Sequence, residues 1–106
     1  MSRVFGSTSV PVVTASEMGG VITVNIKDTG VGNVAINNIT LYAGSSQATC
    51  STATYYLNGN PASAPPITIK PGQTYTVVYS NCNPPASEVT GVVVTTSTGT
   101  YSAAVT

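Results

Sequence analysis

The sequence has few charged residues, and it contains neither histidine nor tryptophan. Only 6% of its 106 residues are Asp, Glu, Lys or Arg, whereas an ordinary soluble domain is about one quarter charged. Without histidine, the usual general base at neutral pH and the commonest metal ligand are missing. These absences exclude most side-chain chemistry, so we expect a protein that is not an enzyme and uses no cofactor.

Cations are too few and too scattered to form a binding patch. Arg3, Lys27 and Lys70 are single residues far apart in the sequence, whereas nucleic-acid binding and polybasic membrane binding both need clustered Lys and Arg. We therefore expect no nucleic-acid partner. The first nine residues contain no apolar run long enough for a signal peptide or a membrane span. Either the protein is cytoplasmic or the chain begins after a removed targeting segment.

Apolar and polar residues alternate with the period of β-strands. In the run from Val21 to Lys27, Ile22, Val24 and Ile26 alternate with polar residues, which predicts a strand with one buried and one wet face.

The next strand, expected from Val34 to Tyr42, changes its alternation part-way. Ile39 and Leu41 continue the apolar face only if Asn37 and Asn38 together take up an extra residue, which a β-bulge or a strand changing sheets would provide.

Eight short strands separated by turn residues are predicted, at residues 10–14, 21–27, 34–42, 52–57, 67–69, 74–80, 88–96 and 99–105. Pro11 in the first strand requires an edge position, since proline has no N–H to donate. No segment has the periodicity of an amphipathic helix. The pattern predicts an all-β fold, an antiparallel immunoglobulin-like β-sandwich of seven to eight short strands, with residues 1–9 as a linker and residues 10–106 as one domain.

Cys50 and Cys82 are the two cysteines, each expected in a loop just after a strand. They would form a disulfide that ties neighbouring strands together, or they are two unrelated buried thiols. A catalytic cysteine would need a base, and zinc would need two more soft ligands, all of which the sequence lacks. A disulfide would imply an oxidising compartment or the cytosol of a hyperthermophile.

The acidic residues Glu17, Asp28 and Glu88 are far apart in the sequence and fall in or beside loops. We interpret them as solvated turn residues, with Asp28 capping the turn at Thr29-Gly30. A pair of them could serve glycosidase-like hydrolysis only if the fold brought two together. Calcium needs several clustered oxygen ligands, and Asp28, Asn25 and Asn33 offer few, so we predict no metal.

Two further features concern the surface. Asn38-Ile39-Thr40 is an N-glycosylation sequon, which is meaningful only in an exported chain. Six tyrosines could form a platform for sugars, with Tyr55 and Tyr56 as the candidate ligand or partner surface, or they could be half-buried sheet residues. The uncharged run from Gly91 to Thr96 would accept a strand from a neighbour if it lay at a sheet edge.

Three segments resemble a known family. The strand from Gly20 to Gly30 ends in Asp-Thr-Gly, residues 34–42 contain Ile-Thr-Leu, and the segment from Ile69 to Tyr75 contains a Pro-Gly-Gln turn. Across roughly residues 20–80 this resembles the extracellular β-sandwich of archaeal type IV pilins and archaellum-associated proteins. Similar modules occur in cell-surface adhesion and S-layer-associated domains. The family also has a leader and an N-terminal apolar helix, which this sequence lacks, so membrane attachment would need a helix absent from this chain.

The resemblance implies a non-enzymatic extracellular structural module, the globular domain of a pilin-like or archaellum-associated cell-surface protein. Such a module acts by subunit packing and adhesion. Expected partners are further copies of the chain, or filament or S-layer components, with glycans as another class of ligand. The alternative function is a carbohydrate- or S-layer-binding immunoglobulin-like module.

Overall fold

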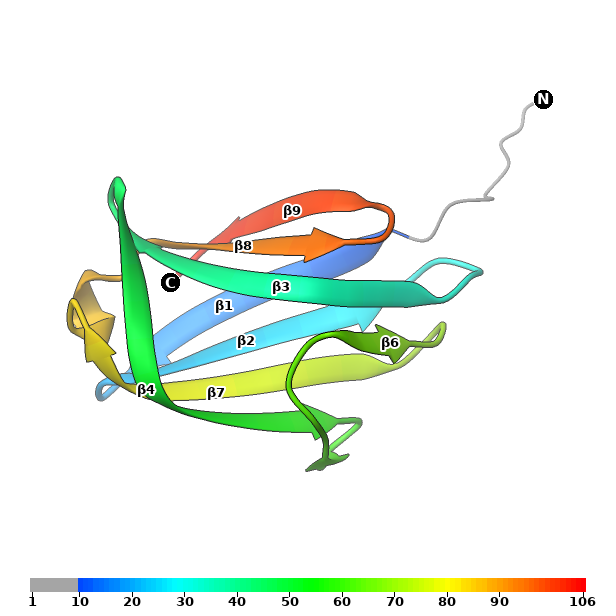
Figure 1. Ribbon diagram of the computed structural model, residues 1–106, viewed down its shortest axis with the longest axis horizontal. Coiled ribbons are helices and arrows are strands. Elements are labelled where there is room, and N and C mark those ends of the chain that lie inside the picture. Colours follow the sequence, from blue (N-terminus) through cyan, green and yellow to red (C-terminus); the bar gives the residue numbers. More distant parts are fainter. Residues whose placement is uncertain (1–9) are drawn as a thin grey trace.

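The computed structural model describes residues 10–106, most of which lie in β-strands (Figure 1). The nine strands of this part are β1 (Pro11–Met18), β2 (Val21–Asp28), β3 (Val34–Ala43), β4 (Ser46–Leu57), β5 (Asn60–Pro61), β6 (Ile67–Ile69), β7 (Thr74–Asn83), β8 (Gly91–Thr96) and β9 (Gly99–Ala104). A 3₁₀ turn, η1 (Ala86–Glu88), lies between β7 and β8. The predicted all-β antiparallel fold is confirmed. The linker predicted for residues 1–9 lies outside the described residues.

The strands form two facing layers that share β4. The order of hydrogen-bonded neighbours is β1-β2-β7-β4-β3-β8-β9, with β5 beside β4 and β6 beside β3. Ser46–Ala48 of β4 pairs with β3, and Thr49–Leu57 pairs with β7. Figure 1 shows β4 descending from the upper layer to the lower one. This single strand therefore joins the β3-β8-β9 layer to the β1-β2-β7 layer.

The two ends of the sheet meet at the C-terminus. Ala15 of β1 forms a parallel bridge with Val105. The N–H of Thr106 donates to the Ala15 carbonyl at 3.1 Å, and the N–H of Glu17 donates to the Thr106 carbonyl at 2.9 Å. These contacts nearly close the sandwich into a barrel at one end of β1.

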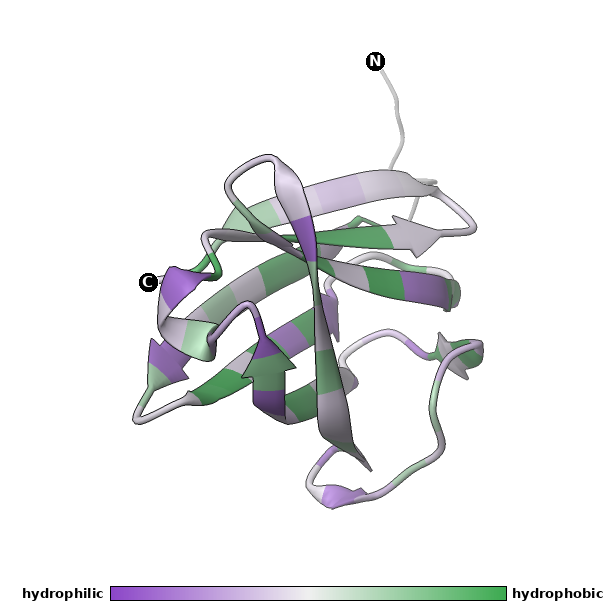
Figure 2. Cartoon of the chain, turned by 60° about the vertical axis from the view of Figure 1, so that its left-hand side comes forward, coloured by the Kyte–Doolittle hydropathy of each residue, from purple (hydrophilic) through white to green (hydrophobic). Residues whose placement is uncertain are grey.

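Alternation along the strands builds the core. Ile22, Val24 and Ile26 of β2 are all fully buried, as the sequence predicts. Figure 2 shows the alternation as green bands separated by pale or purple ones. The core consists of Ala15, Ile22, Val24, Ile26, Val34, Ile36, Leu41, Ala48, Ile69, Tyr75, Val77, Ala86, Val89, Val92 and Val94.

The predicted irregularity in β3 is a β-bulge. Ile36 is opposite Thr96 and Asn38 is opposite Thr95, so Asn37 is the extra residue of β3. Both Asn37 and Asn38 are exposed, while Leu41 is 3% exposed and returns to the core. The bulge thus restores the apolar face after the parity of the sequence has slipped.

Several strand boundaries differ from the predicted ones. β1 continues to Met18 because a tight turn at Gly19-Gly20, with φ of +61° and +86°, folds β2 back along its whole length. Glu88 belongs to η1 and not to a strand, since the N–H of Glu88 donates to the Pro85 carbonyl. Asn60–Pro61 adds a short strand that the sequence pattern did not reveal.

Residues 91–96 do not lie at a sheet edge. β8 pairs with β3 on one side and with β9 on the other, so its main-chain groups are already occupied. The apolar, uncharged character of this segment reflects an interior strand, because Val92 and Val94 are both fully buried. This segment therefore cannot accept a strand from a neighbour.

Candidate interaction surface

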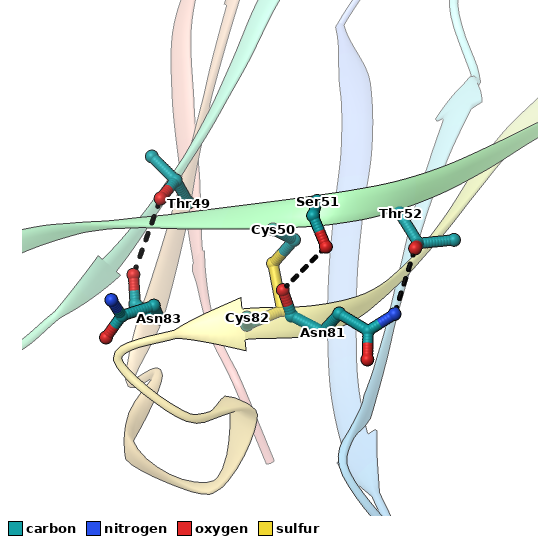
Figure 3. The surroundings of a disulfide bond; sticks show 7 residues. All are labelled: Thr49, Cys50, Ser51, Thr52, Asn81, Cys82 and Asn83. Atoms are coloured by element: carbon teal, nitrogen blue, oxygen red, sulfur yellow. Dashed lines mark hydrogen bonds between the residues drawn. A yellow bond between two sulfur atoms is a disulfide. The ribbon is translucent and has the colours of Figure 1, made fainter.

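The disulfide predicted between Cys50 and Cys82 is present, with an S–S distance of 2.02 Å (Figure 3). The two residues are directly opposite each other in the pairing of β4 with β7. Both were expected in loops, and that placement is wrong. The small polar residues around Cys50 resemble a loop in the sequence, but Thr side chains also suit the pleated surface of a strand.

Hydrogen bonds surround the disulfide on both strands. The Ser51 hydroxyl donates to the Asn81 carbonyl at 3.3 Å, and the Asn81 amide nitrogen donates to the Thr52 hydroxyl at 3.0 Å (Figure 3). Asn81 has a φ of +55°, in the left-handed region that Asn tolerates better than most residues. The core-facing residues of β4 change here from Ala48 and Cys50 to Ala53 and Tyr55, so their parity shifts by one.

The three acidic residues occupy separate local settings. A Glu17 carboxylate oxygen accepts the N–H of Gly20 at 2.9 Å across the β1–β2 turn. The Asp28 Oδ1 accepts the N–H of Gly30 at 3.0 Å, which is the turn cap predicted for it. Glu88 is exposed on η1. Within residues 10–106, no three His, Cys, Asp or Glu side chains gather as a metal site.

The interpretation of the acids as solvated turn residues is wrong for Asp28, which is fully buried. Its Oδ2 atom has no hydrogen-bond partner in the described part of the chain. Asn25 and Asn33, the other two residues considered for a calcium site, do not gather around Asp28. Asn25 projects from the opposite face of β2, where its Oδ1 accepts the Thr76 hydroxyl at 2.7 Å, and Asn33 is exposed in the following loop.

The tyrosines do not form a continuous exposed platform. Tyr55 packs against the core and its ring stacks on that of Tyr75, with ring centroids 6.3 Å apart and planes inclined by 15°. Tyr56, the next residue of β4, projects from the other face and is half-buried. Adjacent residues of a strand point to opposite faces, so the fold separates the two tyrosines that the sequence placed together.

Burial changes the acidity of two tyrosines that face the core. It raises the pKa of Tyr79 to about 12, and the neighbouring Tyr55 adds to that rise. Burial also raises the pKa of Tyr75, with smaller contributions from Tyr55 and Tyr79. The Tyr75 hydroxyl donates to the Ser63 carbonyl at 2.7 Å, so this phenol is neutral and fixes the loop that precedes β6.

The outward side of the β1-β2-β7-β4 layer carries an almost uncharged surface. The strand register places the side chains of this surface in two rows that cross all four strands. We define the outer face as the residues of these rows: Thr14, Ser16, Thr23, Asn25, Thr54, Tyr56, Thr76 and Val78. All eight are exposed or half-buried. None is charged, and the cation nearest in register is Lys27 in the next row.

Sequence reasoning named only part of this outer face. The alternation of β2 already indicated that Thr23 and Asn25 lie on a wet side. The same period-two signal is present in Thr74 to Ser80 and Thr52 to Leu57, but sequence alone does not show that these three strands are neighbours. The predicted glycosylation residue, Asn38, lies elsewhere, exposed in β3 beside the bulge.

The chain was compared with protein-family models, curated proteins and solved structures, and none of them matches it. No cavity is detected among the described residues. Residues 10–106 also contain no helix of the length and apolarity needed to cross a membrane.

Proposed function

We propose that this chain is a non-enzymatic extracellular structural module, the globular domain of a pilin-like or archaellum-associated cell-surface filament protein, which acts by packing against neighbouring subunits. The observation that carries the proposal is the outer face. It extends over four strands and presents Thr, Ser, Asn and Tyr in register, without a charge.

The physical argument concerns the cost of removing this surface from water. Burying a charged group between subunits costs several kcal/mol per ion unless it is paired with excellent geometry. Hydroxyl and amide groups cost less and can form hydrogen bonds across an interface. The Thr76 hydroxyl already donates to Asn25 Oδ1, so some polar groups of the outer face have hydrogen-bond partners within the face. A face of this composition can therefore be covered by a neighbour at low desolvation cost.

Two further features support a cell-surface location. The Cys50–Cys82 disulfide is the type of bond that persists in oxidising compartments. Asn38 is exposed and begins a sequon whose third residue is Thr40, so an exported chain would present it to glycosylation.

Carbohydrate or S-layer binding is the weaker candidate. It relied on Tyr55 and Tyr56 acting together, whereas Tyr55 packs against the core. Of the two candidate residues, only Tyr56 projects from the outer face.

A charge on the outer face tests the proposal. Thr14 is exposed at one end of a row, so T14E should leave the fold intact and prevent the full-length protein from entering surface filaments. The matched control is S102E, an exposed position on β9 in the other layer. Filaments sheared from producing cells would be assayed for each variant by immunoblotting. Incorporation of T14E at the level of S102E and the unmodified protein would refute a role for the outer face in packing.

A further inference from the structure

An open strand edge lies on the β4 side of the β1-β2-β7-β4 layer. Residues 49–54 of β4 pair with β7 on one side and with no described strand on the other. The pairing of β4 with β3 ends at Ala48, and its pairing with β5 begins only at Tyr56. We call residues 49–54 the β4 edge.

Hydrogen bonds beside the β4 edge show which main-chain groups point outward. The Tyr55 carbonyl accepts the N–H of Ala62 at 2.9 Å, on the side away from β7. The N–H of Asn58 donates to the Thr74 carbonyl at 2.8 Å, toward β7. Main-chain groups alternate between the two sides along a strand. The N–H and C=O of Ala53, two residues before Tyr55, therefore face outward, away from β7.

The β4 edge lacks several common devices that prevent strands from pairing between molecules. Charged side chains, proline and coverage by another segment are the common ones. β4 contains no charged residue, proline or glycine. At the other end of the same layer, β1 carries Pro11 and Glu17, and Thr106 covers part of its length. The β1 edge of this layer is therefore partly protected against pairing, whereas the β4 edge lacks these protections.

The β4 edge is also held in place. The Cys50–Cys82 disulfide links it covalently to β7, and hydrogen bonds from Ser51 and Asn81 flank that link. A strand that is already ordered loses little conformational entropy when it acquires a partner.

We propose that the β4 edge pairs antiparallel, about a twofold axis, with the β4 edge of a second copy of this chain. The occupant follows from composition. The segment Thr-Cys-Ser-Thr-Ala-Thr is uncharged and rich in Thr, and cross-strand Thr pairs are favourable in antiparallel sheets. A charged peptide would find no counter-charge there. Pairing two copies would continue the outer face of one into that of the other. This inference rests on the proposed packing function and specifies the partner and the contact.

The test compares the unmodified chain with two lysine variants by sedimentation velocity over a range of concentrations. T52K/T54K puts two charges on exposed positions of the β4 edge, and T100K/S102K puts the same charges on exposed positions of β9. Juxtaposed like charges cost several kcal/mol. We therefore expect the dimer dissociation constant to rise by at least about tenfold in T52K/T54K and to stay unchanged in T100K/S102K.

A second measurement needs no variant. Amide hydrogen exchange of the unmodified chain should slow at Ala53 as the concentration rises through the dissociation constant. An unmodified chain that is monomeric at millimolar concentration, or an Ala53 amide with concentration-independent exchange, would overturn the inference. An equal effect of both lysine pairs would also overturn it. If the chain associates but T52K/T54K associates as strongly, the β4 edge is not the contact. Thr54 also belongs to the outer face, so packing through that face is then judged separately by T14E, which lies at the other end of the layer.

Discussion

Removing the disulfide should lower the stability of the fold substantially. Cys50 and Cys82 are 32 residues apart in the sequence, and the chain-entropy relation assigns about 3.7 kcal/mol at 25 °C to closing a loop of that length in the unfolded chain. Both residues are only half-buried, so replacing them with alanine removes little apolar burial. We therefore expect C50A/C82A to lose about 3.7 kcal/mol of unfolding free energy, mainly through the unfolded state.

Equilibrium urea unfolding, followed by far-UV circular dichroism, measures this loss directly. For a domain of this size the same loss lowers Tm by roughly 15 to 20 °C. Reducing agent should bring the unmodified protein to the stability of C50A/C82A and should leave C50A/C82A unchanged. A loss below about 1 kcal/mol, less than a third of the loop-closure value, would refute the reasoning. It would show that the unfolded chain is not appreciably constrained by the link between β4 and β7.

Three further changes have expected outcomes. Deletion of Asn37 should abolish cooperative unfolding, because it removes the bulge and turns Leu41 out of the core. The control N37A should have an unfolding free energy within about 0.5 kcal/mol of that of the unmodified protein. Equal stability of the two variants would contradict the strand register. Y75F should lose about 1 kcal/mol in urea unfolding, since it removes the hydrogen bond to the Ser63 carbonyl, and an unchanged midpoint would count against that bond. Burial raises the pKa of Tyr79 from 10.0 to about 12. The free energy of unfolding should therefore be constant below pH 10 and fall as the pH rises from 10 through 12. Urea unfolding across this pH range should show a smaller fall for Y79F than for the unmodified protein.

Local pattern was sufficient for several elements. The alternation of Ile22, Val24 and Ile26 defined β2 and its buried face, since side chains of a strand alternate regardless of what lies beside it. The parity slip at Asn37 and Asn38 indicated the bulge for the same reason. The turn cap by Asp28 needs only residues two positions apart, so it too could be predicted.

Local pattern failed where the chain changes layer. Around Ser51 and Asn81 the core-facing parity of β4 and β7 shifts, and Asn81 adopts a positive φ. Strands that switch between sheets commonly do so through such bends. A sequence reading that expects uninterrupted alternation ends the strand at this point. For this reason the sequence pattern predicts loops at Cys50 and Cys82, which lie opposite each other in paired strands.

The sequence by itself determined the all-β class, the buried faces and the scarcity of charge, because these depend on residue type and on period-two alternation. Only the tertiary structure decided which strands are neighbours. It buried β8 between β3 and β9, left residues 49–54 of β4 as the open edge, and turned Tyr55 inward and Tyr56 outward. Pairing between distant strands is set by the packing of the whole sandwich, and no local signal in the chain encodes it.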